Sequence, residues 1–485
     1  MVKTAKQAHR RPGPAVVHGA PDLAVTELDR AHRVAKGKTA RVAAPLDSHG
    51  AFTPGPTRDP IGLLLEQAES RVPELVPVRH GRMLVSPFTF YRGAALPMAA
   101  DLAETPTSGL RVQMCGDAHV ANFGAFASPE RRLVFDVNDF DESLPGPFEW
   151  DVKRLAASLA VAGRDNGFST KARRKIALSA VATYRTAMHT FADMTLLKVW
   201  YAHLDIEEAM GQFRSQLKAS RYKKTEDLLA KAHTRDSTQA LAKLTVVVDG
   251  RRRIVSEPPL IVPIEELFAD QIDAEALYEV IDGLIHKYRR TLQSDRRHLL
   301  EQFQLVQMAR KVVGVGSVGT RAWILLMESG NEPLFLQAKE AQASVLAGFA
   351  GRSQYANQGE RVVAGQHLMQ AASDIFLGWQ RTTGVDGVDR DFYVRQLRDW
   401  KFSLPIERMV PRGMAIFAGL CAWTLARAHA RSGDRVALAA YLGSFDKFDH
   451  AIADFSETYA DQNEIDHAAL QAAVDSGRAE AKSGL

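Results

Sequence analysis

The sequence predicts an α+β protein in which two β-containing blocks are set among helices. Short apolar strands and acidic loops occupy residues 110–141, and a second group of strands lies within residues 309–400. Apolar residues three or four positions apart, which are typical of amphipathic helices, fill most of the chain between and after these blocks. Because 485 residues exceed the length of one average domain, we expect more than one structural unit.

The composition excludes several classes of protein. Hydrophobic residues make up 46% and charged residues 24%, which is typical of a soluble globular chain. No apolar run reaches the roughly 18–20 residues of a membrane span. Two cysteines, Cys115 and Cys421, cannot form a disulfide scaffold, and no apolar signal-peptide core follows the basic N-terminus. We expect a cytoplasmic protein without a membrane span.

The N-terminal part of the chain is basic and rich in Ala, Pro and Gly. Residues 1–42 hold nine Lys and Arg against three Asp and Glu, although the whole chain carries only +4. We expect residues 1–57 to form a disordered tail with at most one short helix near residues 22–35. Weak binding of this tail to nucleic acid or anionic surfaces is the alternative to simple solvation, and no other nucleic-acid contact is expected.

Local signals place the remaining elements in order. Asp59 is a candidate N-cap for a helix that runs through Arg71, and Asp249-Gly250 is a strong hairpin turn. The remaining patterns predict strands at 110–114, 133–137, 244–248, 252–255, 311–315, 322–327, 333–338 and 392–397, and helices within 150–235, 262–308, 360–377 and 412–481.

The first group of chemically informative residues lies between two predicted strands. Asp117 and Asn122 stand five positions apart, with His119 between them. This spacing lets an aspartate face an acceptor hydroxyl while an asparagine oxygen turns back onto a magnesium ion. Asp139 and Asp141 follow after a strand–turn–strand that would return them beside Asn122, and their hard oxygen donors suit magnesium.

Two other interpretations of these residues stay open. The first is a loop with ordinary surface acids. The second is a hydrolytic metal site built from Asp117, His119, Asp139 and Asp141, although one histidine among carboxylates is not a strong transition-metal pattern.

A glycine-rich segment opens the second β-containing block. Gly314, Gly316 and Gly319 have the G-x-G-x-x-G spacing, and residues 322–327 after them are strand-like. A dinucleotide-binding fold requires a helix at that place, whereas strand–glycine loop–strand is the arrangement that covers nucleotide phosphates in kinases. A plain hairpin with glycine turns is the alternative.

A lysine and a glutamate follow the glycine-rich segment. Lys339 ends a predicted strand and could contact the α- and β-phosphates of a nucleotide. Glu360 begins an amphipathic helix, and we expect it to form an ion pair with Lys339. Glu340 is the competing partner, but it is adjacent to Lys339 and should point to the other face of the strand. Surface positions are the alternative for both Lys339 and Glu360.

These parts together resemble a protein-kinase-like phosphotransferase. Gly116-Asp117-x-His119-x-x-Asn122 followed by Asp139-Phe-Asp is similar to the loops of the aminoglycoside and choline phosphotransferase branch, with Cys115 where that branch has a histidine. The resemblance implies ATP and Mg²⁺ as cofactors, Asp117 as the catalytic base, and a hydroxyl-bearing acceptor that the sequence does not name.

From about residue 59 onward the chain also resembles a bacterial family of unassigned function, the domain of unknown function 2252. The motifs that carry this resemblance are Arg79-His-Gly-Arg82-Met, Phe90-Tyr-Arg92-Gly, Cys115-Gly-Asp-Ala-His, Asn138-Asp-Phe-Asp-Glu, Trp150-Asp-Val-Lys-Arg154-Leu, Gln370-Ala-Ala-Ser-Asp-Ile-Phe-Leu-Gly and Tyr459-Ala-Asp-Gln-Asn. This family brings no settled activity, so function rests on the site residues.

The order of the motifs differs from that of a kinase, because the catalytic loop precedes the glycine loop. The kinase interpretation therefore requires a circularly permuted, two-lobed α+β fold with a helix-rich large lobe. The helix that normally precedes the catalytic loop would be residues 414–431, which end in Leu425-Ala-Arg-Ala-His429. The expected regions are the tail 1–57, a catalytic-loop and helical region 58–308, a nucleotide-binding β region 309–400 and C-terminal helices 401–485.

Several other residues have two interpretations. Asp151 resembles the buried aspartate that braces the catalytic loop, or it is a helix N-terminal acid. Three arginines also have two interpretations: they form structural ion pairs, or they bind a phosphorylated or acidic ligand. They are Arg79, Arg82 and Arg92.

We carry three hypotheses of function. The leading one is an ATP- and magnesium-dependent phosphotransferase. Its alternatives are a non-catalytic nucleotide-binding or scaffold protein and a metal-dependent phosphoester hydrolase.

Overall fold

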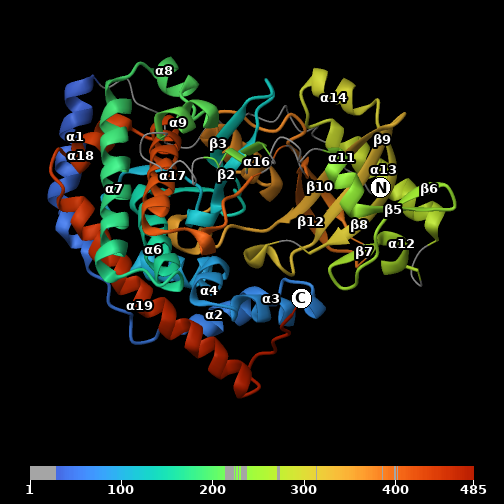
Figure 1. Cartoon of the computed structure of the whole chain (residues 1–485), viewed down its shortest axis with the longest axis horizontal. Helices are drawn as coiled ribbons and strands as arrows, with labels where there is room; N and C mark the ends of the chain where they lie inside the picture. The colour runs from blue at the N-terminus through green and yellow to red at the C-terminus, as the bar shows by residue number, and fades with distance from the viewer. Residues whose placement is uncertain are drawn as a thin grey trace, which may run out of the picture.

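The structure confirms a mixed α and β protein. It is a computed structural model that describes residues 29–213, 223, 226–227, 229–230, 237–269, 273–312, 314–384, 386–397, 400 and 402–484. Long helices gather on one side of the molecule and a six-stranded sheet forms the other, with the acidic-loop segment between them (Figure 1). Within the described residues no helix is both long enough and apolar enough to span a membrane.

The helical side is built around α6 (Phe148–Asp165), α7 (Thr170–Asp193), α17 (Pro411–Ser432) and α19 (Lys447–Asp475). Helix α7 packs along α17, and α19 crosses α6 and α7. The other described helices are α1 (Arg30–Ala43), α2 (Pro60–Ala68), α3 (Val76–Met83), α4 (Pro87–Gly93), α5 (Ala95–Ala103), α8 (Leu196–Tyr201), α9 (Ile206–Phe213), α11 (Ser237–Leu244), α12 (Ile264–Leu267), α13 (Ala274–Arg289), α14 (Ser294–Leu300), α15 (Ala347–Ala350), α16 (Gln358–Met369) and α18 (Arg435–Leu442).

The large sheet is antiparallel throughout, in the order β11-β12-β10-β9-β8-β7. Its strands are β7 (Ile261–Pro263), β8 (Gln304–Lys311), β9 (Ala322–Ser329), β10 (Glu332–Ala341), β11 (Gly378–Thr383) and β12 (Asp389–Gln396). Along β9, Leu325 and Met327 pack in one cluster with α13, whereas Ile324 and Leu326 pack in another with α11. Burial on both faces explains why β9 reads as one continuous apolar run.

Three strand pairs lie outside the large sheet. They are β1 (Arg111–Met114) with β4 (Leu144–Pro147), β2 (Phe123–Ala127) with β3 (Leu133–Val137), and β5 (Thr245–Val248) with β6 (Arg251–Ile254). Asp249 and Gly250 both have positive φ, 49° and 72°, which confirms the two-residue hairpin turn.

Several predicted boundaries were wrong. The helix predicted over 360–377 is α16, which ends at Met369, and Gly378 begins β11. Asp374 accepts hydrogen bonds from the backbone of Phe376 and Gln396, and this turn stops the helical pattern. The helix predicted over 262–308 overlaps β7 and β8, so the sheet begins before residue 309. The helix after Asp59 ends at Ala68, not Arg71, but Asp59 caps it as predicted.

The prediction of a disordered segment 1–57 was wrong for its described part, whereas residues 1–28 lie outside the described residues. Residues 30–43 form α1, and Leu46–Gly50 form a 3₁₀ turn. Helix α1 packs on α18, where Arg33 forms a 2.8 Å ion pair with Asp434. Gly37 allows this close approach because a Cβ there would lie 2.2 Å from the carbonyl oxygen of Ala437. The docking surface lies about 400 residues away in sequence, where local composition carries no signal of it.

We expect Gly37→Val to lower the free energy of unfolding by about 2 kcal/mol, because the new side chain separates α1 from α18. Ala35→Val, at an exposed position of the same helix, is the matched control and should change stability little. Urea unfolding of both variants checks this, and equal stability of the two would mean that α1 does not dock on α18.

Candidate active site

The backbone of the loop that carries Asp117 is hydrogen-bonded to the side chain of Asp151. The Asp151 carboxylate, in the first turn of α6, accepts the backbone N–H groups of Cys115 and Gly116 at 2.8 and 3.0 Å. Its Oδ2 also lies 3.2 Å from Nε2 of His429 on α17. Gly116 has a φ of 81°, and a Cβ there would lie 2.3 Å from the carbonyl oxygen of Glu142. The bracing interpretation of Asp151 is therefore confirmed.

The hairpin β2–β3 brings Asn122 back beside Asp139. The backbone N–H of Asn138 donates to the carbonyl of Asn122 at 2.9 Å. The Asn122 amide nitrogen donates to the carbonyls of Asp117 and Asp139, both at 3.1 Å. Because these two bonds use both amide hydrogens, the side-chain oxygen is the atom of Asn122 that is left for a cation. The strand–turn–strand prediction is confirmed.

Asp117, which is partly exposed, forms an ion pair with the buried Arg154 on α6. Nε and Nη2 of Arg154 donate to Oδ1 of Asp117 at 2.7 and 2.6 Å. The same guanidinium donates to the carbonyl of Tyr91 and lies 4.3 Å from the centre of its ring. Burial by itself lowers the pKa of Arg154, but the Asp117 carboxylate raises it above its ordinary value. Arg154 therefore fixes one oxygen of Asp117 and leaves the other, Oδ2, for a further partner.

His119 lies against that second oxygen. Its Nε2 is 3.6 Å from Oδ2 of Asp117, and burial lowers the pKa of the ring to about 4, so the imidazole is neutral at pH 7. Its Nδ1 is buried and has no hydrogen-bond partner among the described residues. Cys115, in the same loop, is fully buried, and burial raises the pKa of its thiol well above the usual range.

Lys339 joins the large sheet to the acidic loop. Its ammonium forms ion pairs with Asp139 at 3.2 Å and with Asp141, although Asp139 is 200 residues away in sequence. Tyr393, directly opposite Lys339 on β12, donates to Oδ1 of Asp141 at 2.8 Å. Burial by itself lowers the pKa of Lys339, but the two carboxylates raise it, so the ammonium stays charged. Burial and the neighbouring Asp139 raise the pKa of Asp141.

The predicted ion pair between Lys339 and Glu360 was wrong. Lys339 pairs with Asp139 and Asp141, and the helix α16 presents Arg361 to the site instead. Arg361 donates to the carbonyls of Asp141 at 2.7 Å and Gln342 at 2.8 Å. Glu360 lies in the first turn of α16, half-buried, and burial raises the pKa of its carboxyl. Glu340 points away from the site as expected, toward Arg321 at 3.3 Å.

The glycine-rich segment connects β8 and β9, which confirms the strand–loop–strand order, although the strand predicted over 311–315 shares only Lys311 with β8. Of its three glycines only Gly319 has positive φ, 91°. Ser317 in this loop donates to Oδ2 of Asp141 at 3.4 Å, so the loop lies next to the acids. Arg71 holds it from the other side by donating to the carbonyls of Val318 and Gly316.

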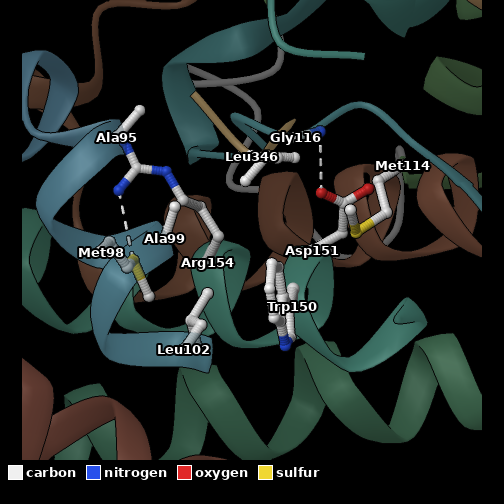
Figure 2. A pocket seen from close by; sticks show the side chains of 10 residues that line it. All are labelled: Ala95, Met98, Ala99, Leu102, Met114, Gly116, Trp150, Asp151, Arg154 and Leu346. Carbon is white, nitrogen blue, oxygen red and sulfur yellow. Dashed lines mark hydrogen bonds between the residues drawn. The ribbon is translucent and has the colours of Figure 1, made fainter. Parts of the chain in front are cut away.

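A small cavity lies behind the Asp117 loop, between α5, α6 and β1 (Figure 2). Its volume is about 10 Å³, and Gly116, Asp151, Arg154 and Trp150 line it together with apolar side chains. This space accommodates about one water molecule. It is therefore part of the support of the loop and not a substrate site.

The donor set fits magnesium with help from a ligand. Asp139, Asp141 and the Asn122 amide oxygen supply hard oxygen donors at one place. Among the described residues no group of three or more His, Cys, Asp and Glu side chains could hold a metal ion by itself. Mg²⁺ in nucleotide sites typically takes one or two carboxylates and completes its shell with phosphates and water, which matches this set.

Sequence reasoning missed Arg71, Arg154, Arg361 and Tyr393. One of them had a local signal, since Arg154 lies three positions after Asp151 and therefore on the same face of α6. Tyr393 shares a face with Lys339 only through the register of β10 and β12. Arg71 and Arg361 act through backbone carbonyls of distant segments, which leave no trace in the sequence.

The segment that follows β10 is hydrogen-bonded to Glu142. The Glu142 carboxylate accepts the backbone N–H of Val345 at 2.7 Å, and Ser344 donates to the Glu142 carbonyl at 2.9 Å. Burial raises the pKa of Glu142 to about 7. The folded protein therefore keeps a proton on Glu142 under conditions in which the unfolded chain has lost it.

We expect the stability of the wild type to fall relative to that of Glu142→Gln as the pH rises from 4.5 to 7. Folded Glu142 is protonated in this window and unfolded Glu142 is not, so up to about 2–3 kcal/mol of stabilisation is lost progressively. Urea unfolding of both proteins across this range measures the difference, with the exposed Glu104→Gln as control. Parallel pH profiles of wild type and Glu142→Gln would contradict it.

Comparisons with known proteins place the chain in a family. The family described as "Uncharacterized protein conserved in bacteria (DUF2252)" matches residues 71–473, which include all of the site residues above. No curated protein and no solved structure matches the chain. The chain therefore belongs to the DUF2252 family.

Proposed function

We propose that this protein is an ATP- and Mg²⁺-dependent phosphotransferase with a circularly permuted kinase-like fold. The observation that carries the proposal is the contact of Lys339 with Asp139 and Asp141. It brings a strand–glycine loop–strand–lysine unit against an Asp-x-x-x-x-Asn loop and its following acids. Kinases bring the same parts together for phosphoryl transfer.

The order of elements in space supports the permutation. After the glycine loop come the strand β9, the lysine strand β10, the helix α16 and the strands β11 and β12. The four strands belong to one sheet, and α16 packs on β10, β11 and β12. The chain then enters α17, whose His429 meets Asp151 beneath the catalytic loop. A helix that precedes this loop in an unpermuted kinase would lie at the same place.

The proposed reaction uses the chain's own groups in distinct roles. Oδ2 of Asp117 accepts the proton of the acceptor hydroxyl while Arg154 fixes the carboxylate through Oδ1. The hydroxyl oxygen attacks the γ-phosphorus, the bond from phosphorus to the bridging oxygen breaks, and ADP leaves with the electron pair. Mg²⁺, held by Asn122 and Asp139 with Asp141 nearby, would neutralise the phosphate charge. Lys339 would turn from the carboxylates to the phosphates, and Gly314, Gly316 and Gly319 would cover them.

The hydrolase alternative has less support. It needs Asp117 and His119 as metal ligands together with Asp139 and Asp141, but Oδ1 of Asp117 is held by Arg154, and this alternative gives no role to the contact of Lys339 with the two acids. A non-catalytic nucleotide-binding protein would keep the Lys339 contacts and has no need of a carboxylate at Asp117.

We expect ATP with Mg²⁺ to raise the melting temperature of the wild type by several degrees and to have no such effect on Asp139→Ala. A ligand at 100 times its Kd stabilises a fold by about 2.7 kcal/mol. Asp454→Ala, which removes a surface carboxylate paired with Arg174 on α7, is the matched control and should respond like the wild type. No response of the wild type to any nucleotide would refute the proposal.

We expect Asp117→Asn to reduce ADP release at least about 100-fold while the Mg–ATP thermal shift persists, because the general base is lost and the shape is kept. Steady-state ADP release, with water or a screened alcohol as acceptor, measures this effect. Unchanged turnover would remove Asp117 from the mechanism, and absent turnover in the wild type with intact nucleotide binding would favour the scaffold alternative.

A further inference from the structure

The surroundings of Asp117 are rich in cationic groups. Arg154 contacts Asp117 directly, and Arg92, at the C-terminal end of α4, lies close enough that its charge and those of Asp117 and His119 influence one another. Because Asp117 pairs with Arg154 and the His119 ring is neutral, Arg92 is the cation that an acceptor beside Asp117 can use.

Resting on the function proposed above, we propose that Arg92 is the anion receptor of the acceptor site, so that the acceptor is a hydroxylated carboxylate or phosphate and not an amine. Arg92 would hold the anionic group while a hydroxyl of the same molecule meets Oδ2 of Asp117.

Arg92 differs from the other arginines of this region in what it contacts. Arg79 is fully buried and donates to Gln67 at 2.7 Å and to the carbonyl of Gly93 at 2.9 Å. Arg154 donates hydrogen bonds to the Asp117 carboxylate and to the carbonyl of Tyr91. The guanidinium of Arg92 makes no hydrogen bond to any described residue, and its Nε is buried without a partner. A half-buried guanidinium whose N–H groups have no acceptor can donate them to an anionic ligand.

The position of Arg92 also suits an acceptor. Its carbonyl oxygen lies 3.2 Å from where a Cβ of Gly316 would be, so the backbone of Arg92 lies next to the glycine loop, and its guanidinium interacts electrostatically with Asp117. The acceptor hydroxyl has to reach phosphoryl groups between these two loops. Of the carboxylates that influence Arg92, Asp117 is paired with Arg154 and Glu407 is exposed, which leaves the charge of Arg92 available.

His119 supplies a second unused group. It is 7% exposed, its Nε2 faces the Asp117 carboxylate, and its Nδ1 has no partner among the described residues. Nε2 lies 3.6 Å from the carboxylate and Nδ1 is enclosed by the protein, so the ring lies beside the base and the selectivity for an anion rests on Arg92. An anion-binding arginine beside the base matches an acceptor that carries a hydroxyl together with a carboxylate or phosphate.

The test uses four probes with one three-carbon skeleton: glycerol, 3-amino-1,2-propanediol, D-glycerate and glycerol 3-phosphate. Calorimetry on the full chain measures their binding with and without Mg²⁺ and a non-hydrolysable ATP analogue. We expect the two anions to bind at least about tenfold more tightly than glycerol and the amine to bind most weakly. Equal binding of all four probes, or binding of none, would overturn the proposal.

Variants of Arg92 separate this proposal from the function on which it rests. Arg92→Gln should abolish the preference for the anions, Arg92→Lys should keep part of it, and Arg174→Gln, a surface control, should keep all of it. The nucleotide analogue should bind Arg92→Gln as it binds the wild type. An equal loss of nucleotide binding would assign Arg92 to the γ-phosphate and overturn the acceptor role. Anion preference without any nucleotide binding would instead refute only the kinase function.

Discussion

The ammonium of Lys339 between the carboxylates of Asp139 and Asp141 is the interaction on which the rest of the site depends. A buried charge without a partner is strongly unfavourable, so Lys339 is stable in its strand only where the acidic loop meets the sheet. Arg361 and Ser317 make further contacts across the same junction, to the Asp141 carbonyl and carboxylate. The guanidinium of Arg395 also acts on both carboxylates, so two positive groups offset the two acids at this junction.

The loop that carries Asp117 is supported both by the neighbouring helix α6 and by the distant helix α17. Asp151 and Arg154 on α6 hold the backbone and the carboxylate of the loop, and His429 on α17 meets Asp151 from the C-terminal region. Because the contacts are set by packing in three dimensions, the sequence order of the glycine loop and the catalytic loop places little restriction on the site. This is the physical basis on which the proposed permutation rests.

Much of the candidate site could be predicted from local sequence patterns. The other contacts depend on packing between segments that are far apart in the sequence. The hairpin that returns Asp139 to Asn122, the brace at Asp151 and the strand–glycine loop–strand all depend on patterns within a few tens of residues. The Lys339–Glu360 pair failed because the acids that reach Lys339 come from a segment far away in sequence, and Arg361 takes the inward position on α16. The short helix allowed near residues 22–35 is α1, which extends to Ala43, and its extent was missed for a related reason, since α1 packs on α18.

The most direct test of this account is anomalous diffraction from crystals grown with Mn²⁺ and a non-hydrolysable ATP analogue. Mn²⁺ replaces Mg²⁺ at oxygen-donor sites and can be located by its own signal. The account predicts one Mn²⁺ bound by Asp139 and the side-chain oxygen of Asn122, with Lys339 turned from the carboxylates to the phosphates beneath Gly314–Gly319. A nucleotide or metal ion bound elsewhere, with the Lys339–Asp139–Asp141 contacts intact, would contradict it.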